Sequence, residues 1–196
     1  SIPCNSEKCI LEPLTKYFIK SMKQLLIVIV FICCIPHLVA QKAEKLKIDS
    51  LNAQLIQNSN LSTDSLLSIY QQNLKDAERI DYPKGVADAF SQLSLVYTYK
   101  ANYDLATKYM LDAINAYEEI GDLKKVANTY AELGYGMKRR DLEKAQYYMQ
   151  KGLKMAKSKH FDTILSRIYN NYGVIKEFKN QLDSAKLFYK KGLQLV

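Results

Sequence analysis

The sequence is poor in the residues that support covalent and metal chemistry. Its four cysteines all precede residue 41, so residues 41–196 can form neither a disulfide nor a thiolate metal site. The same region holds a single histidine, His160, and no paired carboxylates or metal-ligand spacing. The chain has no tryptophan, only seven glycines and only four prolines. These shortages argue against an enzyme, and we expect no catalytic residues, no cofactor and no bound metal.

Acidic residues are scarce in one segment rather than throughout the chain. The net charge is +8, and residues 138–159 hold eight lysines or arginines against Asp141 and Glu143. A charge run of this kind is most simply a solvent-facing helix surface. The alternative is a contact with anionic membrane lipid or an acidic partner.

Long hydrophobic runs are also rare, and the exception lies near the N-terminus. Residues 25–35 are eleven apolar residues in a row, preceded by Met22 and Lys23 and followed by the small residue Ala40. This order is typical of a secretory signal peptide. Eleven residues would rise about 16 Å as a helix, short of the roughly 30 Å hydrocarbon core. We expect residues 22–40 to direct export to the periplasm or cell envelope, and the alternative is an uncleaved membrane anchor.

The residues before this segment have no assigned role. Residues 1–21 form a leader longer than the n-region of a signal peptide, and translation is expected to start at Met22. The export signal also makes nucleic acid an unexpected partner.

A repeat of about forty residues fills the rest of the chain. The aromatics Phe90, Tyr130 and Tyr169 lie 40 and 39 residues apart. Each is followed by a large residue three positions later, then at once by a small one; the small residues are Ser94, Gly134 and Gly173. A second set of positions repeats as alanine, then a large residue, then a small one: Ala106, Ala145 and Ala185; Met110, Met149 and Tyr189; Ala113, Gly152 and Gly192.

This pattern predicts helical hairpins. Apolar residues recur at three- and four-residue steps in each segment, which is the spacing of one buried helix face. Small residues at fixed places allow two antiparallel helices to approach closely. Turns are expected at residues 101–102, 140–141 and 179–180, where Asn and Asp can cap the next helix. Gly134 is therefore a packing position and not part of a phosphate loop, whereas Gly136 has no assignable role.

The order aromatic, leucine, small, then alanine, large, small resembles the tetratricopeptide repeat. The resemblance implies an all-α solenoid of antiparallel helical hairpins, with three units at about 84–121, 122–160 and 161–196. Residues 42–83 are expected to form a partial or divergent first hairpin. The family's usual turn glycine is replaced by Ala101. The last unit lacks a polar capping helix, which predicts that the chain continues beyond Val196.

The resemblance also implies a binding groove lined by the first helix of each hairpin. Helical phase predicts which side chains would line this groove and contact a peptide or partner protein. They are Tyr99, Asn128, Tyr135, Arg139, Arg167 and Asn170, with Asp88 and Ser91 beside them. Tyrosine and arginine are frequent anchors in protein interfaces. The family's two-carboxylate clamp is not expected, because Ser91 and Leu95 stand at two of its positions.

Two functions follow from these observations. The first is a noncatalytic, exported scaffold that binds a peptide or partner protein in the groove. The second is the sensor portion of a larger membrane signalling protein with a histidine kinase or DNA-binding output. The oligomeric state and the identity of the partner do not follow from the sequence.

Overall fold

The computed structural model describes residues 20, 22, 39–51 and 61–195, and these residues form helices and turns with no strand. The chain divides into two compact units, residues 1–47 and residues 48–196. In the first unit, residues 20, 22 and 39–47 are helical. The leader 1–21 and the expected signal segment 22–40 lie almost entirely outside the described residues. Among the helices that are described, none is both long and apolar enough to cross a bilayer.

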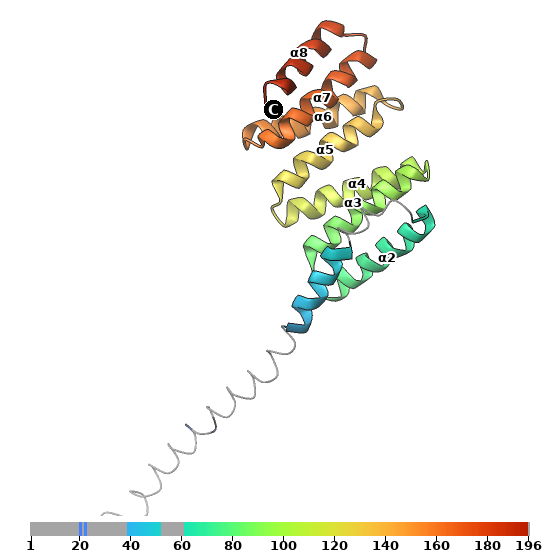
Figure 1. Cartoon of the computed structure of the whole chain (residues 1–196), viewed down its shortest axis with the longest axis vertical. Helices are drawn as coiled ribbons and strands as arrows, with labels where there is room; N and C mark the ends of the chain where they lie inside the picture. The colour runs from blue at the N-terminus through green and yellow to red at the C-terminus, as the bar shows by residue number, and fades with distance from the viewer. Residues whose placement is uncertain (1–19, 21, 23–38, 52–60, 196) are drawn as a thin grey trace, which may run out of the picture. The chain divides into compact units, whose positions relative to one another are not determined.

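The second unit is built from consecutive helices. Residues 48–51 are helical and are followed by seven further helices: α2 (Thr63–Arg79), α3 (Pro83–Tyr99), α4 (Tyr103–Glu119), α5 (Leu123–Met137), α6 (Leu142–Ser158), α7 (Asp162–Phe178) and α8 (Leu182–Leu193). Each helix packs on the next one along the chain, as Figure 1 shows.

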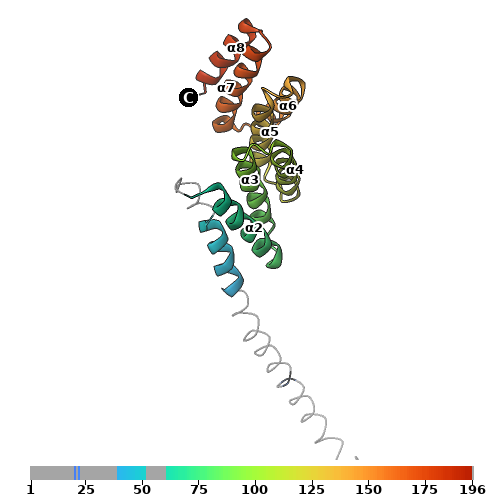
Figure 2. The same cartoon turned by 90° about the vertical axis from the view of Figure 1, so that its right-hand side faces the viewer.

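The strongest pairings join α3 with α4, α5 with α6, and α7 with α8. Figure 2 shows the same side-by-side pairing after a quarter turn. In addition, α5 contacts α7, so alternate helices lie on a common side of the stack. We call α3, α5 and α7 the first helices, and α4, α6 and α8 the second helices. The expected all-α, solenoid-like fold is confirmed, while the repeat boundaries themselves remain a prediction.

Small residues set the distance between paired helices. A Cβ atom added to Gly134 on α5 would lie 2.7 Å from both the carbonyl oxygen of Ala145 and the amide nitrogen of Met149 on α6. A Cβ atom at Gly152 on α6 would lie 2.7 Å from the carbonyl oxygen of Ala127 on α5. Ala145, Met149 and Gly152 are all buried, as their phase predicts. The two backbones therefore touch, and the predicted packing role of Gly134 is confirmed.

Five of the six turns between helices α2 to α8 share one backbone conformation. Each has one residue with φ between 50° and 75°: Asp81, Ala101, Gly121, His160 and Asn180. In each turn, the amide that follows this residue bonds to a carbonyl five residues earlier, for example Asn102 to Tyr97 at 2.9 Å. This is the Schellman motif, in which glycine is the favoured residue at the left-handed position. Only Gly121 satisfies that preference.

The turn between α5 and α6 is different. It contains no residue with positive φ, and the amide groups of Arg140 and Asp141 both bond to the carbonyl of Met137. The Arg140 guanidinium stacks on the ring of Tyr103, with its central carbon 4.2 Å from the ring centroid.

Two of the three expected capping residues act as caps. The side chains of Asn102 and Asp141 accept bonds from the amides of Leu105 and Lys144. Asn180 does not cap α8, because it takes the left-handed position of the turn and leaves Gln181 at the N-cap.

Candidate functional site

The candidate site is the face formed by the first helices, which we call the first-helix face. One polar cluster joins α5 to α7 on this face. The Glu132 carboxylate on α5 accepts a bond from the Asn128 amide one turn earlier, at 2.9 Å. The same oxygen accepts from the guanidinium of Arg167 on α7, at 3.1 Å. The predicted residues Asn128 and Arg167 are thus brought together through an acidic residue that was not predicted.

A second polar cluster joins α3 to α5 and is centred on Asp88. This carboxylate is 14% exposed and accepts from Lys84 at 2.8 Å and from the hydroxyl of Tyr117 at 2.6 Å. Lys125 on α5 lies 3.6 Å away as a further ion pair. Lys84 also bonds to Asp49, at 3.0 Å. Consecutive first helices are therefore tied by acid–base pairs.

Burial and partners shift the titration of this second cluster. Burial alone would raise the pKa of Asp88, but hydrogen bonds from Lys84 and Tyr117 and the charge of Lys125 hold it below its usual value. Burial, together with the hydrogen bond to Asp88 and its charge, raises the pKa of Tyr117. The pKa of Lys84 is raised, since its bonds to Asp88 and Asp49 outweigh its burial. These shifts favour the ionised form of Asp88 and Lys84 and the neutral form of Tyr117, so the hydrogen bonds and ion pairs of the cluster persist at neutral pH.

Of the other predicted residues, Tyr135 lies on α5, Tyr99 ends α3, and Arg139 lies in the turn that follows α5. Tyr135 on α5 is half-buried, and the ammonium of Lys138 lies 3.5 Å from its ring centroid. Arg139 is exposed and forms no ion pair or hydrogen bond with any described residue. Tyr99, at the end of α3, is 66% exposed, and Leu95 one turn earlier is 44% exposed.

Two hollows adjoin three other predicted residues, Asn128, Arg167 and Asn170. One has a volume of about 360 Å³ and contains Asn128 and Lys125 of α5 together with Ile164 of α7. The other has a volume of about 530 Å³ and contains Arg167 and Asn170 of α7. Hollows of this size can each accept one or more side chains of a bound segment.

The repeat identifies one further candidate binding residue, Phe178, that was not predicted from the sequence. Tyr99, Arg139 and Phe178 each follow the repeat aromatic by nine residues, and all three are exposed. Phe178 was findable from the 39-residue spacing between the second and third units. Glu132 was not findable, because its role depends on Arg167, 35 positions away in the chain.

Within the described part of the chain, no group of three or more His, Cys, Asp or Glu side chains is placed to hold a metal ion.

Comparisons with known proteins show the fold and no more. No protein-family model matches the sequence, and no curated protein matches it. Among solved structures, the chain is similar to the crystal structure of BtubC (BKLC) from P. vanneervenii. The two are 18% identical with a TM-score of 0.61, and the match covers 68% of this chain and 56% of BtubC. This chain therefore spans little more than half the length of BtubC, and the likeness supports an all-helical, repeat-like fold.

Proposed function

We propose that this chain is a noncatalytic scaffold of the tetratricopeptide type that binds a peptide or partner-protein segment on its first-helix face. The observation that carries the proposal is the row formed by Tyr99, Arg139 and Phe178. These residues stand at one repeat position of the sequence: Tyr99 and Phe178 end α3 and α7, Arg139 lies in the turn after α5, and all three are exposed. Soluble proteins bury most large aromatic side chains, so exposed rings at this position in two of the three hairpins, Tyr99 and Phe178, support a binding role.

The chemistry of the row fits an extended segment with apolar and acidic side chains. Tyr99 and Phe178 offer rings with few rotatable bonds, which lose little entropy on binding. Arg139 has no carboxylate partner within the described chain and can bind one bidentately. Ion pairs from Glu132 to Arg167 and from Asp88 to Lys125 connect the first helices that carry or precede these residues.

Export is a separate part of the proposal and rests on residues 22–40. Their order of basic, apolar and small residues supports delivery to the periplasm or cell envelope. Retention by an uncleaved anchor is the alternative outcome, and N-terminal sequencing of the protein from its own cells distinguishes the two.

The binding proposal is tested by selecting peptides from a displayed random library against the full chain. Affinities of the selected peptides are then measured by calorimetry on the double variant Tyr99→Ala, Arg139→Ala. We expect at least a tenfold loss. The matched control replaces Tyr147 and Lys157, which are exposed on α6, with alanine. If no selected peptide distinguishes the two double variants, the first-helix face is not the binding surface.

A further inference from the structure

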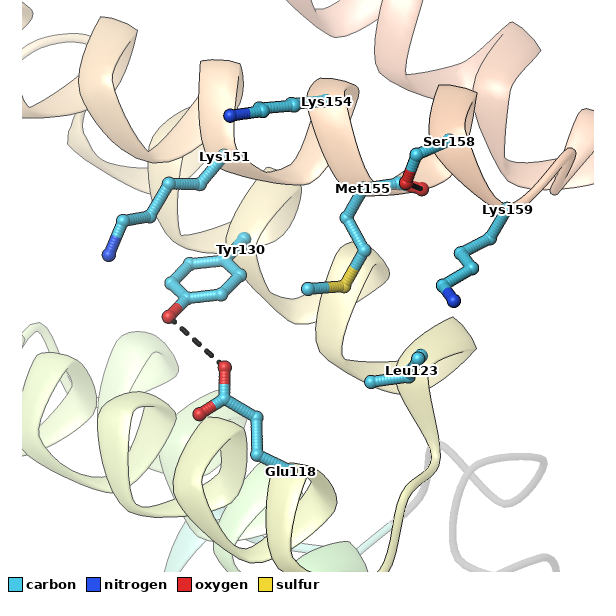
Figure 3. A pocket seen from close by; sticks show the side chains of 8 residues that line it. All are labelled: Glu118, Leu123, Tyr130, Lys151, Lys154, Met155, Ser158 and Lys159. Carbon is cyan, nitrogen blue, oxygen red and sulfur yellow. Dashed lines mark hydrogen bonds between the residues drawn. The ribbon is translucent and has the colours of Figure 1, made fainter.

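A third hollow is lined by residues of α4, α5 and α6, none of which is among the predicted groove residues. Its volume is about 390 Å³. Its apolar part is formed by Leu123, Tyr130 and Met155, and Figure 3 shows the Met155 thioether and the Tyr130 ring side by side within it. Each of these three side chains is only partly exposed, so the apolar surface is recessed rather than protruding.

The border of this hollow is basic. Lys151, Lys154 and Lys159 line it, and in Figure 3 the ammonium groups of Lys151 and Lys159 lie on opposite sides of the apolar part. The side chains of Lys154 and Lys159 form no ion pair or hydrogen bond with any described residue. Lys151 lies over two tyrosine rings, 5.1 Å from the centroid of Tyr130 and 4.9 Å from that of Tyr147.

One acidic group makes the charge distribution around the hollow asymmetric. Glu118 of α4 lies on the side opposite α6 and accepts a long bond, 3.5 Å, from the hydroxyl of Tyr130. The hollow therefore has three cations on its α6 side, one carboxylate on its α4 side and an apolar part between them. This arrangement uses three of the eight basic residues of the segment 138–159.

We propose that this hollow, the α4–α6 pocket, is a second docking site, and that it takes an acidic peptide segment whose apolar side chain enters the pocket. Glutamates or aspartates on either side of that chain would pair with Lys151, Lys154 and Lys159, while Glu118 can accept a backbone N–H of the segment. The charge complementarity selects an acidic partner, and the recessed apolar part selects a side chain that projects from a backbone. A flat anionic bilayer fits less well, because insertion needs protruding apolar groups and Glu118 would face the headgroups.

The proposal is tested on the full chain with one defined probe, the fluorescein-labelled peptide Glu-Glu-Leu-Phe-Glu-Glu, by fluorescence polarisation. Two comparison peptides carry lysine in place of every glutamate or serine in place of leucine and phenylalanine. We expect the probe to bind at least tenfold more tightly than either, and its affinity to fall as salt is raised.

The chain offers a matched pair of variants. Lys154→Glu reverses a charge on the pocket, whereas Lys157→Glu makes the same change on the same helix at an exposed residue that does not line it. We expect Lys154→Glu to weaken the probe about tenfold and Lys157→Glu to change it less than twofold. Because the first-helix face is proposed to bind segments of similar chemistry, the probe is also titrated against the double variant Tyr99→Ala, Arg139→Ala. We expect this variant to keep the part of the affinity that Lys154→Glu removes, and a loss in this variant without a loss in Lys154→Glu would assign the probe to the first-helix face instead.

Several results would overturn the proposal. One is the absence of saturable binding of the probe up to about 1 mM, the dissociation constant of a weak specific contact. The others are equal losses of affinity in Lys154→Glu and Lys157→Glu, and equal affinity for the probe and the serine peptide. A parallel sedimentation assay uses phosphatidylglycerol vesicles. Vesicle binding that depends on Lys154, without binding of the probe, would assign the pocket to a membrane surface and reject the peptide site.

Discussion

Replacing either of two neighbouring glycines of α5 with alanine should have opposite effects on stability. At Gly134, the new Cβ atom would lie 2.7 Å from two backbone atoms of α6, whereas ordinary contact begins at 3.4 Å. The helices must therefore separate by about 0.7 Å at their closest point. Overpacking of this kind costs about 1–3 kcal/mol. At Gly136, nothing lies within 4 Å of the new atom.

The two variants control for each other because both replace a helical glycine with alanine. That replacement alone stabilises a helix by up to about 1 kcal/mol. We therefore expect Gly136→Ala to gain up to about 1 kcal/mol in free energy of unfolding, and Gly134→Ala to lie about 1–3 kcal/mol below it. The assay is urea unfolding followed by far-UV circular dichroism, with tyrosine fluorescence as the second probe, since the chain has no tryptophan. Equal stabilities of the two variants would refute the close contact between α5 and α6.

Three further predictions concern the turns and the Asp88 cluster. Ala101→Gly should raise the free energy of unfolding by about 0.5 kcal/mol, because glycine removes the backbone strain of a φ of 56° and this gain exceeds the added conformational entropy of the unfolded chain. A drop in the urea midpoint would contradict this. Tyr117→Phe should cost about 1.5 kcal/mol, because it removes a hydrogen bond to a buried carboxylate; an unchanged urea midpoint would show that this bond contributes nothing. Asp88→Asn should destabilise the protein at pH 7, and the difference in stability between wild type and variant should shrink as pH falls below the ordinary pKa of 3.8. The reason is that the pKa of Asp88 is lowered in the folded protein, so this carboxylate stabilises the fold only while it is ionised. A difference that stays constant from pH 7 to pH 2.5 in thermal unfolding would show that the charge of Asp88 is irrelevant.

The fold follows from features that are local in the sequence. The repeat aromatics and the small residues at Gly134 and Gly152 mark close contacts between helices, because only small side chains permit backbones to touch. Helix phase alone then places Ala145 and Met149 inside. The turns were less predictable, since five share a left-handed residue that is glycine in only one of them.

The candidate site depends more on contacts between distant residues. Phase places Asn128 and Arg167 on one face, but it does not reveal that Glu132 already pairs with both. Tyr135 is half-buried under Lys138, so it offers a smaller surface than its phase suggests. These pairings depend on side-chain rotamers and on neighbouring repeats, which one helix cannot specify.

The α4–α6 pocket shows the same limit. In the sequence, its basic border is part of a charge run on one predicted helix, and such a run is most simply interpreted as a solvent-facing surface. The apolar part of the hollow comes from Leu123 and Tyr130 of α5 together with Met155 of α6, and the acidic group comes from α4. Only the packing of three helices brings these groups together.

The measurement that tests the central claim most directly is site-specific photocrosslinking in the cells that make this protein. A benzophenone amino acid replaces Tyr99 on the first-helix face, and in a separate strain it replaces Leu187, which is 50% exposed on α8. We predict a discrete crosslinked protein from position 99 that is absent from position 187 and is lost when Arg139→Ala is added. A crosslink from position 187 alone, or one at position 99 that is indifferent to Arg139, would contradict binding on the first-helix face.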